Sequence, residues 1–99
     1  MSNWHFKDLE KKLINNSWVI LEEIYNTEHK NIISSWKIQN LKSKEIRFID
    51  FIGFDDLEKF PIEKAYCCCL RNTNIDLYFR KFRVKNIWHK ELLSFIEKL

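Results

Sequence analysis

The chain has 99 residues, of which 45% are hydrophobic and 31% are charged, and its net charge is +3. This length predicts a single domain over residues 1–99, and the composition excludes a disordered, collagen-like or linker sequence. No apolar run approaches the roughly 18 residues of a membrane span, and no basic start followed by an apolar segment marks a secretory signal. We therefore expect a cytoplasmic protein with no membrane partner.

The first predicted element is a helix over residues 3–14. Phe6, Leu9 and Leu13 recur at helical spacing within it. The polar residues 15–17 end the helix. Because the chain has one glycine and one proline, we expect its turns to be built from Asn, Asp and Ser, whose side chains mimic backbone turns.

Residues 18–25 and 32–39 predict two strands joined by a loop. The first segment, WVILEEIY, is rich in β-branched and aromatic residues, although a continuation of the first helix is an alternative. Alternation in the second segment places Trp36 and Ile38 toward the core.

A third strand is predicted over residues 44–54. Within it, Ile46, Phe48 and Ile52 alternate with Glu45, Arg47 and Gly53. Ile49 and Phe51 break this alternation, which indicates a bulge or a strand that is covered on both faces.

Two further strands, over residues 62–71 and 75–82, flank an Asn-rich turn and form the clearest hairpin of the chain. A closing helix over residues 85–99 carries a broad apolar stripe. Strands with short connections are antiparallel neighbours. We therefore predict an α+β fold, in which an N-terminal and a C-terminal helix pack on a four- to five-stranded antiparallel meander.

The three cysteines are contiguous, from Cys67 to Cys69. In a strand, Cys67 and Cys69 point to one face and Cys68 to the other. An odd number of adjacent cysteines is not a disulfide framework, and the further ligands of a zinc site are missing. We expect three reduced thiols that pack as small hydrophobic groups.

No motif in the sequence names a reaction. His5, His29 and His89 have neither catalytic nor metal-ligand spacing, and the serines and cysteines lack the context of a nucleophile. We expect no catalytic residue, no metal and no cofactor, and hence not an enzyme. One alternative is a small histidine-dependent ribonuclease, if the helices bring His5 and His89 together.

Acidic and aromatic residues gather near the end of the third strand. This acidic segment is the candidate partner-binding site, and its members are Asp50, Phe54, Asp55, Asp56, Glu58 and Phe60. Fixed carboxylates beside rings suit a basic protein partner. Glu22 and Glu23 form a second acidic pair.

A basic tract follows the last strand and offers an alternative face for nucleic acid or for an acidic partner. Its members are Arg80, Lys81, Arg83 and Lys85. Rings interleave with these cations, as on surfaces that bind single-stranded nucleic acid. Four tryptophans and eight phenylalanines exceed what a core of this size easily holds, so some ring surface is expected to stay exposed.

With its Asn-built turns and its segments EIRFIDFIGFDDLEKF and AYCCCLRNTNIDLYFRKF, the chain resembles the immunity proteins of bacterial contact-dependent inhibition and polymorphic toxin systems. The resemblance lies in the general character of the whole chain and not in a single motif. It implies a cytoplasmic protein that binds one cognate toxin domain, often a nuclease, and blocks its active site. The net charge of +3 departs from the acidic character of many nuclease inhibitors. A small nucleic-acid-binding or phage-type regulatory protein is the alternative.

Overall fold

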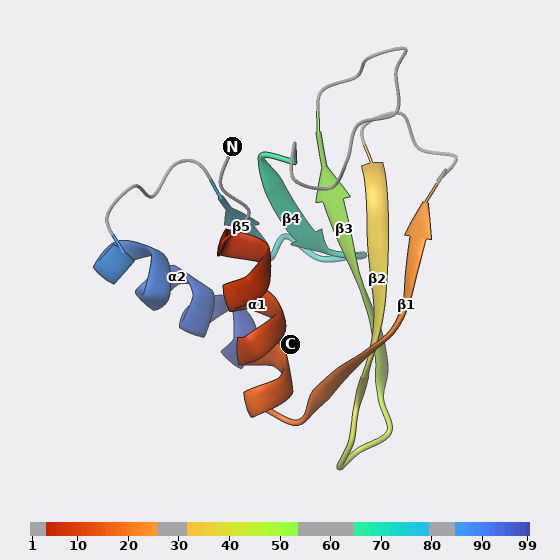
Figure 1. Cartoon of the computed structure of the whole chain (residues 1–99). Helices are drawn as coiled ribbons and strands as arrows, with labels where there is room; N and C mark the ends of the chain where they lie inside the picture. The colour runs from red at the N-terminus through yellow and green to blue at the C-terminus, as the bar shows by residue number, and fades with distance from the viewer. Residues whose placement is uncertain (1–3, 26–31, 54–64, 80–84) are drawn as a thin grey trace.

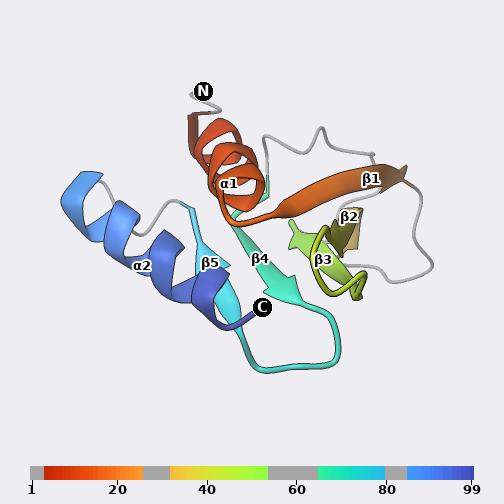
Figure 2. The same ribbon diagram turned by 90° about the horizontal axis from the view of Figure 1, so that it is seen from below.

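The computed structural model describes residues 4–25, 32–53, 65–79 and 85–99. The elements follow one another as α1 (Trp4–Asn15), β1 (Trp18–Tyr25), β2 (Ile32–Asn40), β3 (Ile46–Ile52), β4 (Cys67–Leu70), β5 (Asp76–Tyr78) and α2 (Lys85–Glu97). Each strand pairs antiparallel with the next, so the sheet order is β1-β2-β3-β4-β5. The predicted α+β meander is confirmed, and both helices lie on one side of the sheet (Figures 1 and 2).

Residues 18–25 form a strand, so the alternative of a longer first helix is excluded. The last three strands are shorter than predicted within the described residues. The turn after β4 explains why this strand ends at Leu70. Thr73 donates through its backbone N–H (3.1 Å) and through Oγ1 (2.7 Å) to the carbonyl of Leu70, while Asn72 adopts a positive φ of 66°. These bonds curl the chain away from the ladder.

Asparagine builds the turns, as expected. Asn40 Oδ1 accepts hydrogen bonds from the backbone N–H groups of Lys42 (2.9 Å) and Ser43 (3.0 Å) in the β2–β3 hairpin. This hairpin is tied to the turn after α1, because Leu41 N donates to Ser17 O at 2.7 Å. The turn that leads into β1 is therefore fixed by a hydrogen bond from the β2–β3 hairpin.

An aromatic layer between the sheet and the helices forms the core. Phe51 lies within it, with its ring 4.7 Å from that of Trp36 and 5.7 Å from that of Phe6, measured between centroids. Tilted and edge-to-face contacts of this kind let large rings fill a small volume. The helices contribute a further set of buried side chains: Leu9, Leu13, Trp88, Leu92, Phe95 and Ile96.

The core face of β3 is formed by the two residues that break its alternation. Ile49 and Phe51 are fully buried in the core, whereas Ile46 is exposed. The register explains this facing, because Ile49 pairs with Trp36 and shares its face of the sheet. The irregularities in pairing lie between Ile20 and Glu22 of β1, in the β1–β2 ladder, and between Ile32 and Ser34 of β2, in the β2–β3 ladder.

Aromatic ring surface stays exposed at Tyr78, as expected, but not at the described tryptophan side chains. Trp18, Trp36 and Trp88 are all buried. Among the described aromatic side chains, Tyr78 is the one that belongs to the exposed large hydrophobic residues. Close ring packing in the aromatic layer accommodates more aromatic volume than the composition suggested.

Two neighbours in α1 test this packing. Leu13 is fully buried and Ile14 is 56% exposed. We expect Leu13→Ala to lower the free energy of unfolding by about 2–5 kcal/mol, because it removes core contacts and leaves a cavity. Ile14→Ala should change it by less than about 1 kcal/mol. Urea denaturation followed by tryptophan fluorescence measures both, and equal losses would contradict this assignment of the helix faces.

Candidate functional site

The structure describes only part of the two sites predicted from the sequence. Asp50 lies in β3, whereas the other members of the acidic segment lie outside the described residues: Phe54, Asp55, Asp56, Glu58 and Phe60. Of the basic tract, Arg80, Lys81 and Arg83 also lie outside them. Lys85 begins α2, but its side chain is not described.

Asp50 belongs to a polar cluster on the face of the sheet opposite the helices. Its side chain is buried, and Oδ1 accepts hydrogen bonds from Arg71 Nη2 at 2.7 Å and from Ser35 Oγ at 2.7 Å. Arg71 Nε donates to Oδ2 at 3.1 Å, and the guanidinium lies 4.4 Å from the centre of the Phe48 ring. The hydrogen bond to Asp50 raises the pKa of Arg71. The charge of Asp50 is therefore balanced by Arg71, and its hydrogen bonds connect β2, β3 and the residue that follows β4. The carboxylate has a structural role and is not exposed for a partner to bind.

Breaking this cluster should destabilise the fold. Arg71→Ala leaves the Asp50 carboxylate buried without its cation, and we expect a loss of about 2–4 kcal/mol in the free energy of unfolding. The control is Arg47→Ala, because Arg47 pairs with Glu45 in the solvent-exposed hairpin. That loss should stay below about 1 kcal/mol. Urea denaturation compares the two, and a smaller loss for Arg71→Ala than for Arg47→Ala would refute the structural role.

The three cysteines are free thiols, and Cys67 and Cys68 are buried, as expected. Cys67 and Cys69 face the side of Asp50, while Cys68 pairs with Phe51 and faces the core. Burial, followed by the negative charge of Asp76, raises the pKa of Cys67 to about 11. Burial raises the pKa of Cys68 well above its usual value. Thiols in this state are poor nucleophiles at neutral pH.

Thiol reactivity and alkaline stability follow from these pKa values. At pH 8 the native protein should react with a thiol reagent far more slowly than the unfolded protein, which should give three equivalents without prior reduction. Because the pKa of Cys67 is raised in the fold to about 11, its contribution to stability is complete below the unfolded pKa. It is lost as the pH rises through the folded pKa. Rapid labelling of all three thiols in the native protein would contradict this assignment. So would a free energy of unfolding that rises as the pH increases from the unfolded to the folded pKa of Cys67.

The helices meet at a polar contact centred on Asp8. Trp88 Nε1 donates to Asp8 Oδ2 at 2.9 Å, and His89 Nε2 lies 3.6 Å from the same oxygen. His5 packs edge-on against the indole of Trp88, with 4.6 Å between ring centroids. The described contacts of His5 and His89 thus hold α1 against α2.

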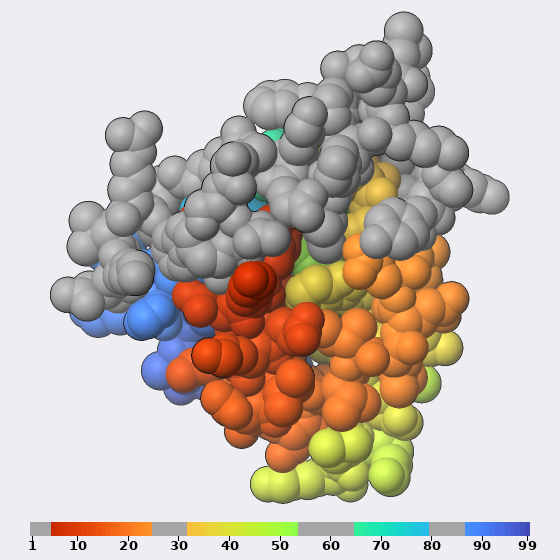
Figure 3. Space-filling model, in the orientation of Figure 1, coloured from red at the N-terminus to blue at the C-terminus, as the bar shows by residue number. Residues whose placement is uncertain are grey.

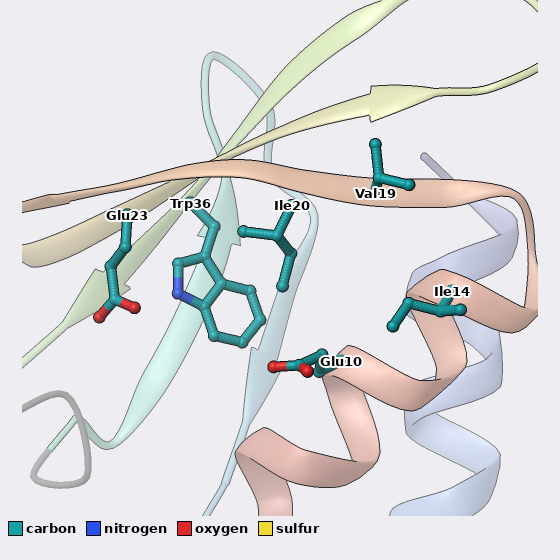
Figure 4. Close-up of a pocket in the computed structure, with 6 residues that line it drawn as sticks. All are labelled: Glu10, Ile14, Val19, Ile20, Glu23 and Trp36. Carbon is teal, nitrogen blue, oxygen red and sulfur yellow. The ribbon is translucent and has the colours of Figure 1, made fainter.

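Another feature is a groove between α1 and β1, which we call the α1–β1 groove (Figure 4). Its volume is about 310 Å³, and its lining comes from both elements and from β2: Glu10, Ile14, Val19, Ile20, Glu23 and Trp36. The groove forms because α1 ends at Asn15 and the chain turns through Ser17, which has a φ of 68°. β1 then leaves in a new direction as an edge strand (Figure 1). Figure 3 shows α1 and β1 together on one surface of the molecule.

A bulge in β1 brings Glu23 to this groove. Before the bulge, Ile20 pairs with Ile38 and faces the helices; after it, Glu22 pairs with Lys37 and Glu23 pairs with Trp36. The extra residue, Leu21, reverses the alternation of the strand. Glu23 and not Glu22 therefore shares a face with Trp36.

The indole of Trp36 carries an unsatisfied donor. The side chain is 5% exposed, and its buried Nε1 has no hydrogen-bond partner in the described part of the chain. In Figure 4 the ring lies between Glu10 and Glu23, with its nitrogen on the side of Glu23. A buried donor without an acceptor costs about 1–3 kcal/mol. Such a group is an exception in folded proteins, and a ligand is one explanation for it.

Sequence reasoning missed this groove. Glu23 was singled out only as one of two adjacent acids, and neither Glu10 nor Trp36 was a candidate. The signal that unites them is the bulge, which is a property of the β1–β2 register and is not visible in the alternation of β1 alone.

The outer surface of the two helices has a different character. A shallow hollow of about 580 Å³ is lined by Lys12, Ile87, His89, Lys90 and Leu93. Ile87 and Leu93 are exposed. This surface is basic and apolar, whereas the α1–β1 groove is acidic and apolar.

No protein-family model matches this chain, and neither the comparison with curated proteins nor that with solved structures found a significant match. Within the described residues, no group of three or more His, Cys, Asp or Glu side chains is arranged to hold a metal ion. Neither described helix has the length and apolar character that crossing a membrane requires.

Proposed function

We propose that this chain is a protein-binding inhibitor, an immunity protein that binds and neutralises a cognate bacterial toxin domain, and that it is not an enzyme. The observation that supports this most is the α1–β1 groove, where a buried indole donor without an acceptor lies between two exposed carboxylates. A partner that supplies the acceptor removes a penalty that the free protein carries.

The walls of the groove are held by the core, which favours a preformed binding surface. Leu9 and Leu13 anchor α1, and Trp18 anchors the start of β1; all three are buried. A surface that is already ordered loses little entropy on binding. Exposed Ile14 and Leu21 lie on these two elements and add apolar area that a partner would cover.

The class of partner follows from the whole-chain resemblance together with the local charge. The resemblance to immunity proteins implies a toxin domain, often a nuclease. Nucleases that bind phosphate backbones carry basic surfaces. Such a surface complements the carboxylates of Glu10 and Glu23, although the chain as a whole has a net charge of +3.

A nucleic-acid-binding regulatory protein is the second candidate. The described surface that favours it is the basic hollow on the helices, with Lys12, His89 and Lys90. The sequence adds a second basic feature, the tract at residues 80–85. A small net charge makes such binding weak and steeply dependent on salt.

Co-expression tests the lead proposal. We expect a polymorphic toxin gene immediately upstream of the gene for this chain, and its C-terminal domain should arrest growth unless this chain is co-expressed. The purified pair should bind with submicromolar affinity at about 0.15 M salt. Under the same conditions RNA and single-stranded DNA should bind weakly. Submicromolar binding of nucleic acid, without rescue from the toxin, would move the assignment to the second candidate.

The acidic segment predicted from the sequence is tested in the same assay. If Asp55 and Asp56 contact the partner, reversing both to Lys should weaken binding by about 2 kcal/mol, while stability changes by only about 0.5 kcal/mol. The rival variant places Glu at Arg80 and Lys81. Unchanged affinity in the Asp55/Asp56 variant would remove this segment from the interface.

A further inference from the structure

We infer that the α1–β1 groove is the receptor for a single lysine or arginine side chain of the partner protein, whose cationic end lies between Glu10 and Glu23. The inference rests on the proposed function to the extent that the partner is a protein. It adds which chemical group of the partner is recognised, and by which residues of this chain.

The charged half of the groove fits a cation. Glu10 comes from α1 and Glu23 from β1, and Figure 4 shows them on either side of the Trp36 ring. Two carboxylates attract an ammonium or guanidinium group, and a neighbouring indole adds cation–π attraction. An anionic ligand would be repelled by the same two carboxylates.

The apolar half fits the stem of a long basic side chain. Ile14 and Ile20 also line the groove, and Ile14 is 56% exposed. Lysine and arginine bury their methylene stems along apolar surface while the charged end reaches a polar group. The groove volume of about 310 Å³ lies at the lower end of the range of roughly 300–1,000 Å³ for small-molecule sites. This volume accommodates the stem and the charged end of one lysine or arginine side chain.

The indole donor indicates that the cation arrives on a peptide. Trp36 Nε1 needs an acceptor, which neither a lysine nor an arginine side chain carries. Each residue of a peptide brings a backbone carbonyl, so a protein segment can supply both the cation and the acceptor. A metal ion fits less well, because Ca²⁺ takes six to eight oxygen ligands and the indole offers none.

The chain contains its own control for this site. Glu22 is adjacent to Glu23 and is equally an exposed residue of β1, but in the register it lies opposite Lys37 and it does not line the groove. Glu91 on α2 is likewise exposed and does not line the groove. The double variants Glu10→Gln/Glu23→Gln and Glu22→Gln/Glu91→Gln have the same net charge, so they separate the site from general electrostatics.

The test uses N-acetyl-arginine methylamide as the probe and its neutral citrulline analogue as the reference compound. Binding is followed by NMR through the indole N–H signal of Trp36, assigned by its through-space contacts to Ile20. We expect a saturable shift with the arginine compound and at least about tenfold weaker binding of the citrulline compound. The Glu10/Glu23 variant should also bind the arginine compound at least about tenfold more weakly, and the Glu22/Glu91 variant within about twofold of the unmodified protein.

Equal binding of the two compounds, an unsaturable shift, or equal losses in the two double variants would overturn the inference. The same variants, assayed with the toxin domain, separate its failure from that of the proposed function. If the Glu10/Glu23 variant neutralises the toxin as well as the unmodified chain, the inhibitor function stands and the groove assignment fails. If the arginine compound binds as expected but the chain does not neutralise the toxin, the groove specificity stands and the toxin partner is wrong.

Discussion

The register of the sheet depends on the neutralisation of one carboxylate. Asp50 lies in β3, the central strand, and its bonds to Ser35 on β2 and to Arg71 after β4 connect three consecutive strands. A slip of one residue would move Asp50 to the helix side and Phe51 out of the core, because successive side chains face opposite sides of a strand. Burying a carboxylate among the aromatic rings would be strongly unfavourable. The cluster therefore selects one register of β2 and β4 against β3.

That register determines which side chains of the sheet face α1. With Ser35 opposite Asp50, Trp36 pairs with Ile49 and faces the helices. The bulge in β1 then places Glu23 opposite Trp36. Glu10 is contributed by α1, which packs on the same face through buried Leu9 and Leu13. The acidic groove is thus a consequence of sheet register, one extra residue in β1 and the direction of one helix.

The fold was largely predictable from the sequence, because hydrophobic periodicity and Asn-rich turns are local signals. They located both helices and all five strands of the meander, and the spacing of Trp36 and Ile38 predicted their facing correctly. Local alternation failed at β3, where Ile46, Phe48 and Ile52 compete with Ile49 and Phe51 as candidates for the core. Pairing with β2 resolves that ambiguity, and pairing is not encoded in β3 alone.

The site was less predictable for the same reason. The adjacent acids Glu22 and Glu23 are equivalent in the sequence, and only the bulge assigns one of them to Trp36. Asp50 was predicted as a docking charge because its acidic neighbours are visible in the sequence. Its true partner, Arg71, lies 21 residues away. The aromatic content predicted exposed ring surface without locating it: Tyr78 is exposed, whereas the three tryptophans whose side chains are described are buried.

The most direct test of the central claim, that a partner docks on the α1–β1 groove, is chemical-shift mapping of the labelled protein with the proposed toxin domain. The account predicts that the largest changes fall on Glu10, Ile14, Ile20 and Glu23 and on the indole N–H of Trp36, while β4 and β5 change little. Changes that leave these residues untouched and concentrate on the basic hollow around Lys12, His89 and Lys90 would contradict it.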